Sequence, residues 1–254
     1  MILLKSNDEI DRMRKAGHII ACTMNRLEKA IQPGISTSDL DKIAYEYILK
    51  NGAKPNFLGL YNYPATICAS INDEVIHGIP ASSRVLLEGD IVKIDMGCIW
   101  GGYHSDMART FPVGSISTKR SRLLDVTQEA LSIAIQSSIP GNTVGDIGFA
   151  VANYVEKNGY SVVREYCGHG VGLQLHEEPQ VPNFGQAGKG PSLREGMTLA
   201  LEPMVNEGTW QVKTLENGWT VVTEDHCDSA HFENSIFIGH HGPEILTKIQ
   251  GECV

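Results

Sequence analysis

An amphipathic pattern opens the chain. Apolar residues recur at spacings of three and four over residues 10–31, which predicts a helix over about 7–31. Ser6 and Glu9 have the spacing of a capping box at the start of this helix. A second helix is predicted over about 37–51, where an Asn-Gly pair ends it. The chain therefore begins with a pair of helices.

A strand pattern follows the helix pair. Short strands are predicted over residues 66–71 and 74–77, and a longer apolar run ends at Asp95. A Gly-Gly turn then leads into a returning strand over residues 103–113, which predicts a β-hairpin.

The same order of elements then recurs. Helices are predicted over about 119–138 and 143–157, followed by a strand over residues 162–167. A small hairpin is predicted over residues 210–223, and a last long strand over 231–238.

Matching residues indicate that this recurrence is a duplication. Residues 33–53 match residues 140–160, with Pro-Gly at both starts and Asn-Gly near both ends. Residues 87–95 and 194–202 each contain Glu-Gly, an apolar run and a terminal carboxylate. A duplicated unit of two helices and antiparallel strands predicts an α+β fold with a pseudo-two-fold axis. Equivalent strand ends would meet near that axis.

We expect one domain over residues 1–254, with internal repeats at about 7–114 and 117–240. The net charge of -9 argues against a specific nucleic-acid partner. No apolar run reaches the ~20 residues of a membrane span, and the first residues lack the features of a signal peptide, so we expect a cytoplasmic protein without a membrane partner. The six cysteines form no Cys-x-x-Cys pair and are expected to be reduced.

Four carboxylates carry the candidate chemistry. Asp95 and Asp106 lie on the two arms of the first hairpin, and Glu202 and Glu233 repeat this arrangement in the second half. Each carboxylate alone has a plain interpretation as a solvated strand or turn residue. Four of them converging at an axis would repel one another strongly without cations, so the sequence predicts a site for two cations.

His169 is a candidate ligand because glycines on both sides permit close backbone approach and unusual dihedral angles. A plain turn histidine is the alternative. A phosphate loop is a weaker interpretation of Gly168-x-Gly170-x-Gly172, since no helix follows it. One histidine with four carboxylates suits Mn(II), Fe(II) or Co(II), with Zn(II) as a further candidate.

His77 and His176 occupy equivalent places in the two repeats and are candidate hydrogen-bond donors or proton carriers in the cleft. Several apolar or aromatic residues nearby either line a specificity pocket or pack in the core: Phe57, Leu60, Tyr63, Cys68, Leu175 and Trp219. The remaining histidines are interpreted as ordinary surface or strand residues: His18, His104, His226, His231, His240 and His241.

With these residues in place, the chain resembles the type I methionine aminopeptidases, in their short bacterial form, of the pita-bread metallopeptidase family. The resemblance spans nearly the whole chain. The spacing from Glu202 to Glu233 leaves no room for the helical insertion of type II relatives. The motifs that carry the resemblance are His77-Gly-Ile-Pro80, Glu88-Gly-Asp-Ile-Val-Lys-Ile-Asp95, Tyr103-His-Ser-Asp106, Gly168-His-Gly-Val-Gly172, His176-Glu-Glu-Pro179, Glu195-Gly-Met-Thr-Leu-Ala-Leu-Glu-Pro203 and Glu233.

The resemblance implies two divalent metal ions. Asp95 would hold one ion and His169 with Glu202 the other, while Asp106 and Glu233 would bridge them. The ions would activate a bridging water that attacks the scissile carbonyl, and Glu202 would also handle the proton of this water.

The resemblance also implies the substrate contacts. The free amine of the substrate would bind the ion on the Asp95 side, and His77 and His176 would contact the substrate and stabilise the tetrahedral intermediate. Leu60 and Leu175 stand where relatives often have Tyr and Phe, a departure that bears on pocket shape.

The implied enzyme is a metal-dependent hydrolase that removes the initiator methionine from nascent proteins, preferably before a small second residue. We expect a monomer, with the ribosome as a candidate further partner. Cleavage of Xaa-Pro bonds, as in prolidase relatives, is one alternative, although those relatives usually have an added N-terminal domain. A binding module without catalysis is the other alternative, and relatives of that kind lack the metal ligands.

Overall fold

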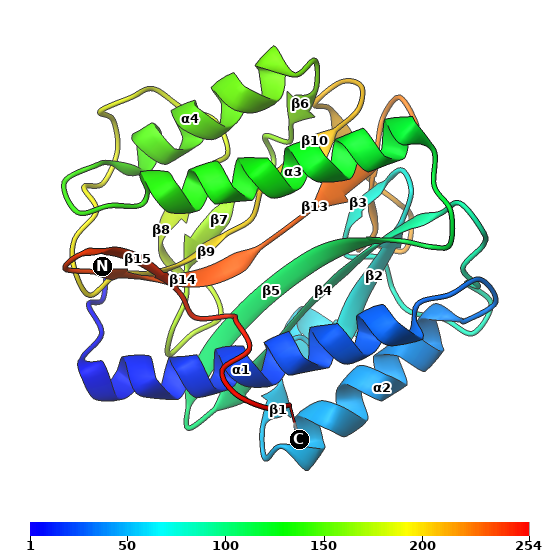
Figure 1. Ribbon diagram of the computed structural model, residues 1–254, viewed down its shortest axis with the longest axis horizontal. Helices are drawn as coiled ribbons and strands as arrows, with labels where there is room; N and C mark the ends of the chain where they lie inside the picture. Colours follow the sequence, from blue (N-terminus) through cyan, green and yellow to red (C-terminus); the bar gives the residue numbers. More distant parts are fainter. Residues whose placement is uncertain (254) are drawn as a thin grey trace.

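The computed structural model describes residues 1–253, in which the helices form two pairs. Figure 1 shows one pair at the bottom and one at the top, with β4 and β5 running between them. The predicted helices are confirmed, and the box of Ser6 and Glu9 caps the first of them. The helices are α1 (Asn7–Ala30), α2 (Thr37–Lys50), α3 (Thr118–Ser137) and α4 (Val144–Lys157), with a 3-10 turn, η1, at Leu60–Asn62.

The first half of the chain builds a sheet in the order β1-β4-β2, with β5 paired to β4. The β4–β5 pair is the predicted hairpin, and it is antiparallel over its whole length. These strands are β1 (Lys54–Pro55), β2 (Ile67–Ile71), β4 (Ile91–Trp100) and β5 (Tyr103–Pro112).

The second half builds a sheet in the order β15-β14-β9-β7-β8, and two small sheets, β13-β10-β6 and β11-β12-β3, complete the fold. The β11–β12 pair is the small hairpin that the sequence predicts. The remaining strands are β3 (Glu74–Ile76), β6 (Ser161–Val162), β7 (Gly168–Gly170), β8 (Glu177–Val181), β9 (Thr198–Leu201), β10 (Met204–Asn206), β11 (Val212–Thr214), β12 (Val221–Thr223), β13 (Ser229–His231), β14 (Asn234–Gly239) and β15 (Gly242–Ile245).

Two predicted strands differ from the structure. The strand expected over residues 162–167 is limited to β6, because the chain then leaves its partner β10 and residues such as Tyr166 turn toward a pocket. The single strand expected over residues 231–238 is wrong. Here β13 pairs with β10 while β14 pairs with β9, so the chain changes sheets at Phe232 and Glu233.

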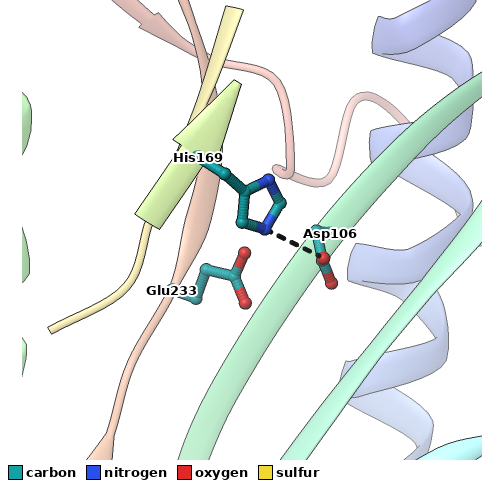
Figure 2. A group of neighbouring side chains, drawn as sticks. All are labelled: Asp106, His169 and Glu233. Carbon is teal, nitrogen blue, oxygen red and sulfur yellow. Dashed lines mark ion pairs between the residues drawn. The ribbon is translucent and has the colours of Figure 1, made fainter. Parts of the chain in front are cut away.

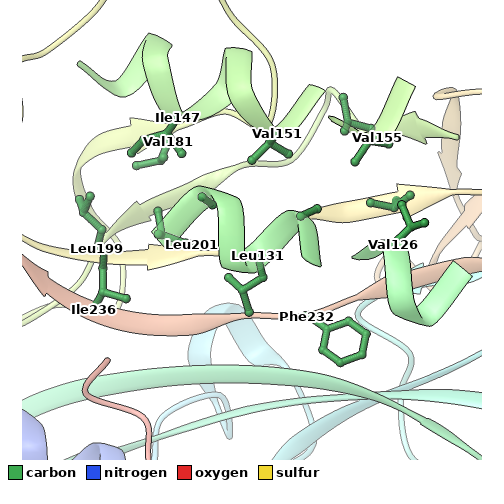
Figure 3. Close-up of a cluster of buried hydrophobic side chains, with 14 of the residues drawn as sticks. Val126, Leu131, Ile147, Val151, Val155, Val181, Leu199, Leu201, Phe232 and Ile236 are labelled. Carbon is green, nitrogen blue, oxygen red and sulfur yellow. The ribbon is translucent and has the colours of Figure 1, made fainter. Parts of the chain in front are cut away.

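Each helix pair covers its own apolar cluster. Residues of α1 and α2 such as Ile20 and Leu40 pack against Ile94 of β4. In the other half, Val151 of α4 packs in a cluster with Leu199 of β9, and both side chains are fully buried (Figure 3). Burying one such side chain contributes about 1.5–3 kcal/mol. Each cluster thereby fixes strands beneath its own helix pair.

The C-terminal segment folds back over α1 (Figure 1). The carbonyl of Leu246 lies so close to Gly17 that a Cβ there would be 2.2 Å from it, and the Gln250 N–H donates to His18 Nδ1 at 3.0 Å. This path brings Cys22 and Cys253 together in a disulfide. The expectation of six reduced cysteines is therefore wrong for this pair, while the free cysteines are Cys68, Cys98, Cys167 and Cys227.

Among residues 1–253, no helix combines the length and the apolar character that crossing a bilayer requires.

Candidate metal centre

The predicted ligands come together in one pocket of about 520 Å³ where the two halves meet. Two of them lie on the first hairpin and three come from the second sheet. They are Asp95 of β4, Asp106 of β5, His169 of β7, Glu202 directly after β9, and Glu233 directly before β14.

Three of the ligand side chains form a tight group. Single ligand atoms of Asp106, His169 and Glu233 all lie within 4.8 Å of one another, and Figure 2 shows the three side chains pointing toward a common centre. His169 Nε2 is 3.9 Å from Asp106 Oδ2 and 3.7 Å from Glu202 Oε1. This geometry leaves room for an ion between the donors.

The strand register explains how the first hairpin supplies two ligands. Asp95 pairs with Ala108 and Asp106 pairs with Gly97, so the two aspartates are diagonal neighbours on one face of the hairpin. Within residues 1–253, Asp95 Oδ1 and Glu233 Oε1 are buried without a hydrogen-bond partner. Buried carboxylate oxygens without partners are costly, and a bound cation would satisfy both.

Burial shifts the pKa of every one of these predicted ligands. It raises the pKa of Asp95 to about 7. Burial and the charges of neighbouring carboxylates raise the pKa of Asp106, Glu202 and Glu233 well above the usual range. Burial, and then the nearby His176, lower the pKa of His169 to about 4, so its imidazole is neutral and able to bind a metal. Such a set of oxygen donors with one imidazole fits divalent Mn, Fe, Co or Zn.

His169 is held by a strand rather than a turn, so the turn alternative is wrong. A Cβ on Gly168 would lie 2.4 Å from the Ala200 carbonyl oxygen, and one on Gly170 would lie 2.4 Å from that of Glu178. The glycines therefore serve close backbone approach, as predicted, and neither needs a positive φ. The hydrogen bond between His169 Nδ1 and the Gly170 carbonyl, 2.9 Å long, leaves Nε2 free to face the centre.

We expect Gly168→Ala to destabilise the protein, because its methyl group would collide with the β9 backbone. Overpacking of this kind costs about 1–3 kcal/mol, which corresponds to a fall in Tm of about 2–12 °C for a chain of this size. Thermal unfolding of Gly185→Ala is the control, since its Cβ would meet no atom closer than 3.5 Å. Equal Tm values for both variants would contradict the close approach.

The two predicted substrate histidines line the same pocket as the ligands. The rings of His176 and His169 are 4.5 Å apart, while the ring of His77 lies 6.2 Å from that of Trp219. Burial, with a smaller contribution from His176, lowers the pKa of His77 to about 4, and burial also lowers the pKa of His176. Both imidazoles are therefore suited to donate a hydrogen bond as neutral groups.

The six predicted apolar residues also line this pocket. Tyr63 is fixed because its hydroxyl donates to the carbonyls of Ile67 and Gly78, each at 3.1 Å, and its ring lies edge-on to Trp219 at 4.9 Å. The pocket wall thus joins this aromatic pair to the predicted metal ligands.

Some residues around the pocket were missed by the sequence analysis. Tyr61, Tyr166 and Cys167 line it. Cys167 follows Cys68 by 99 positions, the same offset that separates His77 and His176, and this equivalence in the repeat was the available signal for Cys167. Lys5 forms a buried ion pair with Glu177, next to His176, and no sequence pattern pointed to this pair.

His231, interpreted as an ordinary histidine, is 1% exposed, and its Nε2 lies 3.7 Å from Glu202 Oε2. Burial, followed by the charges of His77, Lys93 and Arg109, lowers its pKa to about 3. It is therefore a neutral, buried neighbour of a predicted ligand.

A buried histidine–carboxylate cluster at the base of a pocket, on a duplicated helix–strand unit, is suited to metal-dependent hydrolysis. The model of Metallopeptidase family M24 matches residues 11–240, and the chain belongs to this family. It is 52% identical to a methionine aminopeptidase of Clostridium perfringens over 98% of this chain and 100% of that one. It is 51% identical to methionine aminopeptidase 1 of Bacillus subtilis, over 98% of this chain and 100% of that one.

A solved structure gives the same result. The crystal structure of methionine aminopeptidase from Thermotoga maritima matches with a TM-score of 0.96 and 44% identity, covering 98% of this chain and 100% of that one. The resemblance and the pita-bread fold class predicted from the sequence are confirmed. The protein is a metallopeptidase.

Proposed function

We propose that this chain is a methionine aminopeptidase that removes the initiator methionine from nascent proteins, preferably before a small second residue. One observation carries the proposal: the ligand set, two neutral histidines and an apolar wall share a single pocket. The high identity to proteins named methionine aminopeptidases, over their full length, supports it.

The proposed centre holds two divalent ions. Asp95 would bind one ion, His169 and Glu202 the other, and Asp106 and Glu233 both. Two bound ions would supply an activated water and polarise the scissile carbonyl. Mn(II), Fe(II), Co(II) and Zn(II) all suit these donors.

Glu202 is the proposed proton carrier. Its carboxylate would accept a proton from the attacking water and return it to the leaving amine as the C–N bond breaks. His77 and His176 would donate hydrogen bonds to the substrate carbonyl, whose oxygen gains negative charge in the transition state. Their neutral state at physiological pH follows from their lowered pKa values.

The apolar wall is the proposed methionine subsite. A thioether packs well against aromatic rings, and Tyr63 and Trp219 offer such rings beside Cys68 and Phe57. Leu60 and Leu175 complete the lining. Aliphatic side chains at these two positions would leave more freedom around the methionine than aromatic ones.

We further propose the setting in which the enzyme acts. A single catalytic domain with its internal repeat would work as a cytoplasmic monomer on chains that emerge from the ribosome. The separate apolar clusters beneath the two helix pairs support the repeat.

The test compares peptide cleavage by protein stripped of metal and then loaded with Mn(II), Fe(II), Co(II) or Zn(II). We expect release of methionine from Met-Ala-Ser with at least one metal. Preferential cleavage of Xaa-Pro peptides would favour the prolidase alternative instead. A folded protein that cleaves neither peptide with any of the four metals would favour the binding module.

A further inference from the structure

His231 is buried against the metal centre without satisfying its own polar atoms. Among the described residues, neither Nδ1 nor Nε2 has a hydrogen-bond partner. An unsatisfied buried polar group is costly, and such a group in a native structure calls for an explanation. By contrast, the ligand His169 has its Nδ1 bonded to the Gly170 carbonyl.

The carboxylate of Glu202 lies beside the His231 ring, between two histidines. Its Oε1 is 3.7 Å from His169 Nε2, and its Oε2 is 3.7 Å from His231 Nε2. His231 is absent from the pocket lining formed by residues 1–253. Substrate would therefore meet Glu202 from one side while His231 stands behind it.

The backbone of His231 is held by hydrogen bonds. A hydrogen bond between its imidazole and the Glu202 carboxylate would therefore require movement of these two side chains alone. The His231 N–H donates to Thr110 Oγ1 at 2.9 Å, and the Thr110 hydroxyl donates to the His231 carbonyl at 2.8 Å. His231 also pairs with Met204 across the β10–β13 ladder. An ordinary N–H···O bond of about 2.9 Å lies less than 1 Å from the present separation.

The surroundings favour a hydrogen-bond donor at this position. Lys93 is fully buried nearby and donates to the carbonyls of Asn72 and Ser229, at 2.6 and 3.0 Å. Arg109 donates to the carbonyl of Glu233 and to Asn234 Oδ1. Because the cationic side chains are already committed to other acceptors, the imidazole N–H of His231 is the donor placed to reach Glu202.

We propose that His231 is a positioning residue whose Nε2–H donates a hydrogen bond to Glu202 Oε2 and fixes this carboxylate for metal binding and proton transfer. The proposal rests on the function proposed for Glu202 above. Groups that orient metal ligands in this way typically change metal affinity or activity about 10- to 100-fold when they are removed.

The test pairs His231→Leu, which removes the donor, with His231→Gln, which keeps an N–H donor. For His231→Leu we expect kcat on Met-Ala-Ser to fall about 10- to 100-fold, while KM changes less than about threefold. Mn²⁺ titration by calorimetry should give weaker binding by a similar factor. His231→Gln should restore both quantities to within several-fold of the wild type.

The Tm of the metal-free protein distinguishes positioning from a merely structural role. His231→Leu removes an unpartnered polar group, so its metal-free Tm should equal or exceed that of the wild type. A lower metal-free Tm with unchanged kcat and Mn²⁺ binding would overturn the proposal, as would a His231→Gln variant no better than His231→Leu. If the wild type cleaves no Met-Ala-Ser, the proposed activity fails, and the Mn²⁺ titrations alone decide the role of His231.

Discussion

Replacing Glu202 with glutamine is expected to lower kcat for Met-Ala-Ser by about 10³-fold or more. The substitution keeps the shape of the side chain and removes its charge. In the proposed mechanism Glu202 both binds an ion and carries a proton, and loss of a general acid–base alone costs about 10²–10⁴-fold. Glu202 lines the shared pocket with its Oε1 3.7 Å from His169 Nε2, so the substitution acts within the proposed metal centre.

The measurement is kcat at saturating peptide and saturating Mn²⁺, so that weakened metal binding does not mask the loss of chemistry. Glu224→Gln is the matched control, because it removes the same charge at an exposed position that does not line the pocket in residues 1–253. A folded Glu202→Gln protein with kcat within tenfold of the wild type would rule out the proton-carrying role.

Periodicity along the chain was sufficient to predict the helices and the first hairpin. The spacing of apolar residues in α1 comes directly from burial of one helix face, and the Ser6–Glu9 box marks its start. The proposed ligands Asp95 and Glu202 could be singled out from the sequence for a related reason. Each carboxylate follows a run of strand residues that is buried, and such a position requires a partner.

Other features depend on contacts that no local pattern encodes. The change of sheets at Phe232 and Glu233 follows from the separate pairing of β13 and β14. The Cys22–Cys253 disulfide joins residues 231 positions apart, and only the path of the C-terminal segment over α1 brings them together. His231 has the sequence context of any strand histidine, and its nearness to Glu202 appears only when β9 and β13 are in place.

Removal of metal ions is expected to lower Met-Ala-Ser cleavage to background, and Mn²⁺ to restore it. Mn²⁺ should also raise Tm, because a ligand at about 1,000 times its Kd adds roughly 4 kcal/mol to the free energy of unfolding. For a chain of this size, that corresponds to about 8–16 °C. Thermal unfolding with and without Mn²⁺ measures the shift.

The Mn²⁺ effect should be larger at pH 8 than at pH 6. Burial raises the pKa of Asp95 from its ordinary 3.8 to about 7. Between about pH 4 and pH 7 the unfolded chain therefore releases this proton more readily than the folded, metal-free protein, so the free energy of unfolding falls as pH rises through this range. Below pH 7 an incoming ion must displace this proton. His169, with its pKa lowered to about 4, is neutral at both pH values and adds no proton of its own.

Asp95 alone should therefore weaken Mn²⁺ binding about tenfold between pH 8 and pH 6, and the raised pKa values of the other carboxylates act in the same direction. Calorimetry in buffers of different ionisation enthalpy counts the protons released. An Asp95→Asn variant should bind Mn²⁺ more weakly and lose part of the pH dependence, because the amide has no proton to displace. Equal Mn²⁺ affinity at both pH values, with no proton released, would mean that no carboxylate with a raised pKa is among the metal ligands.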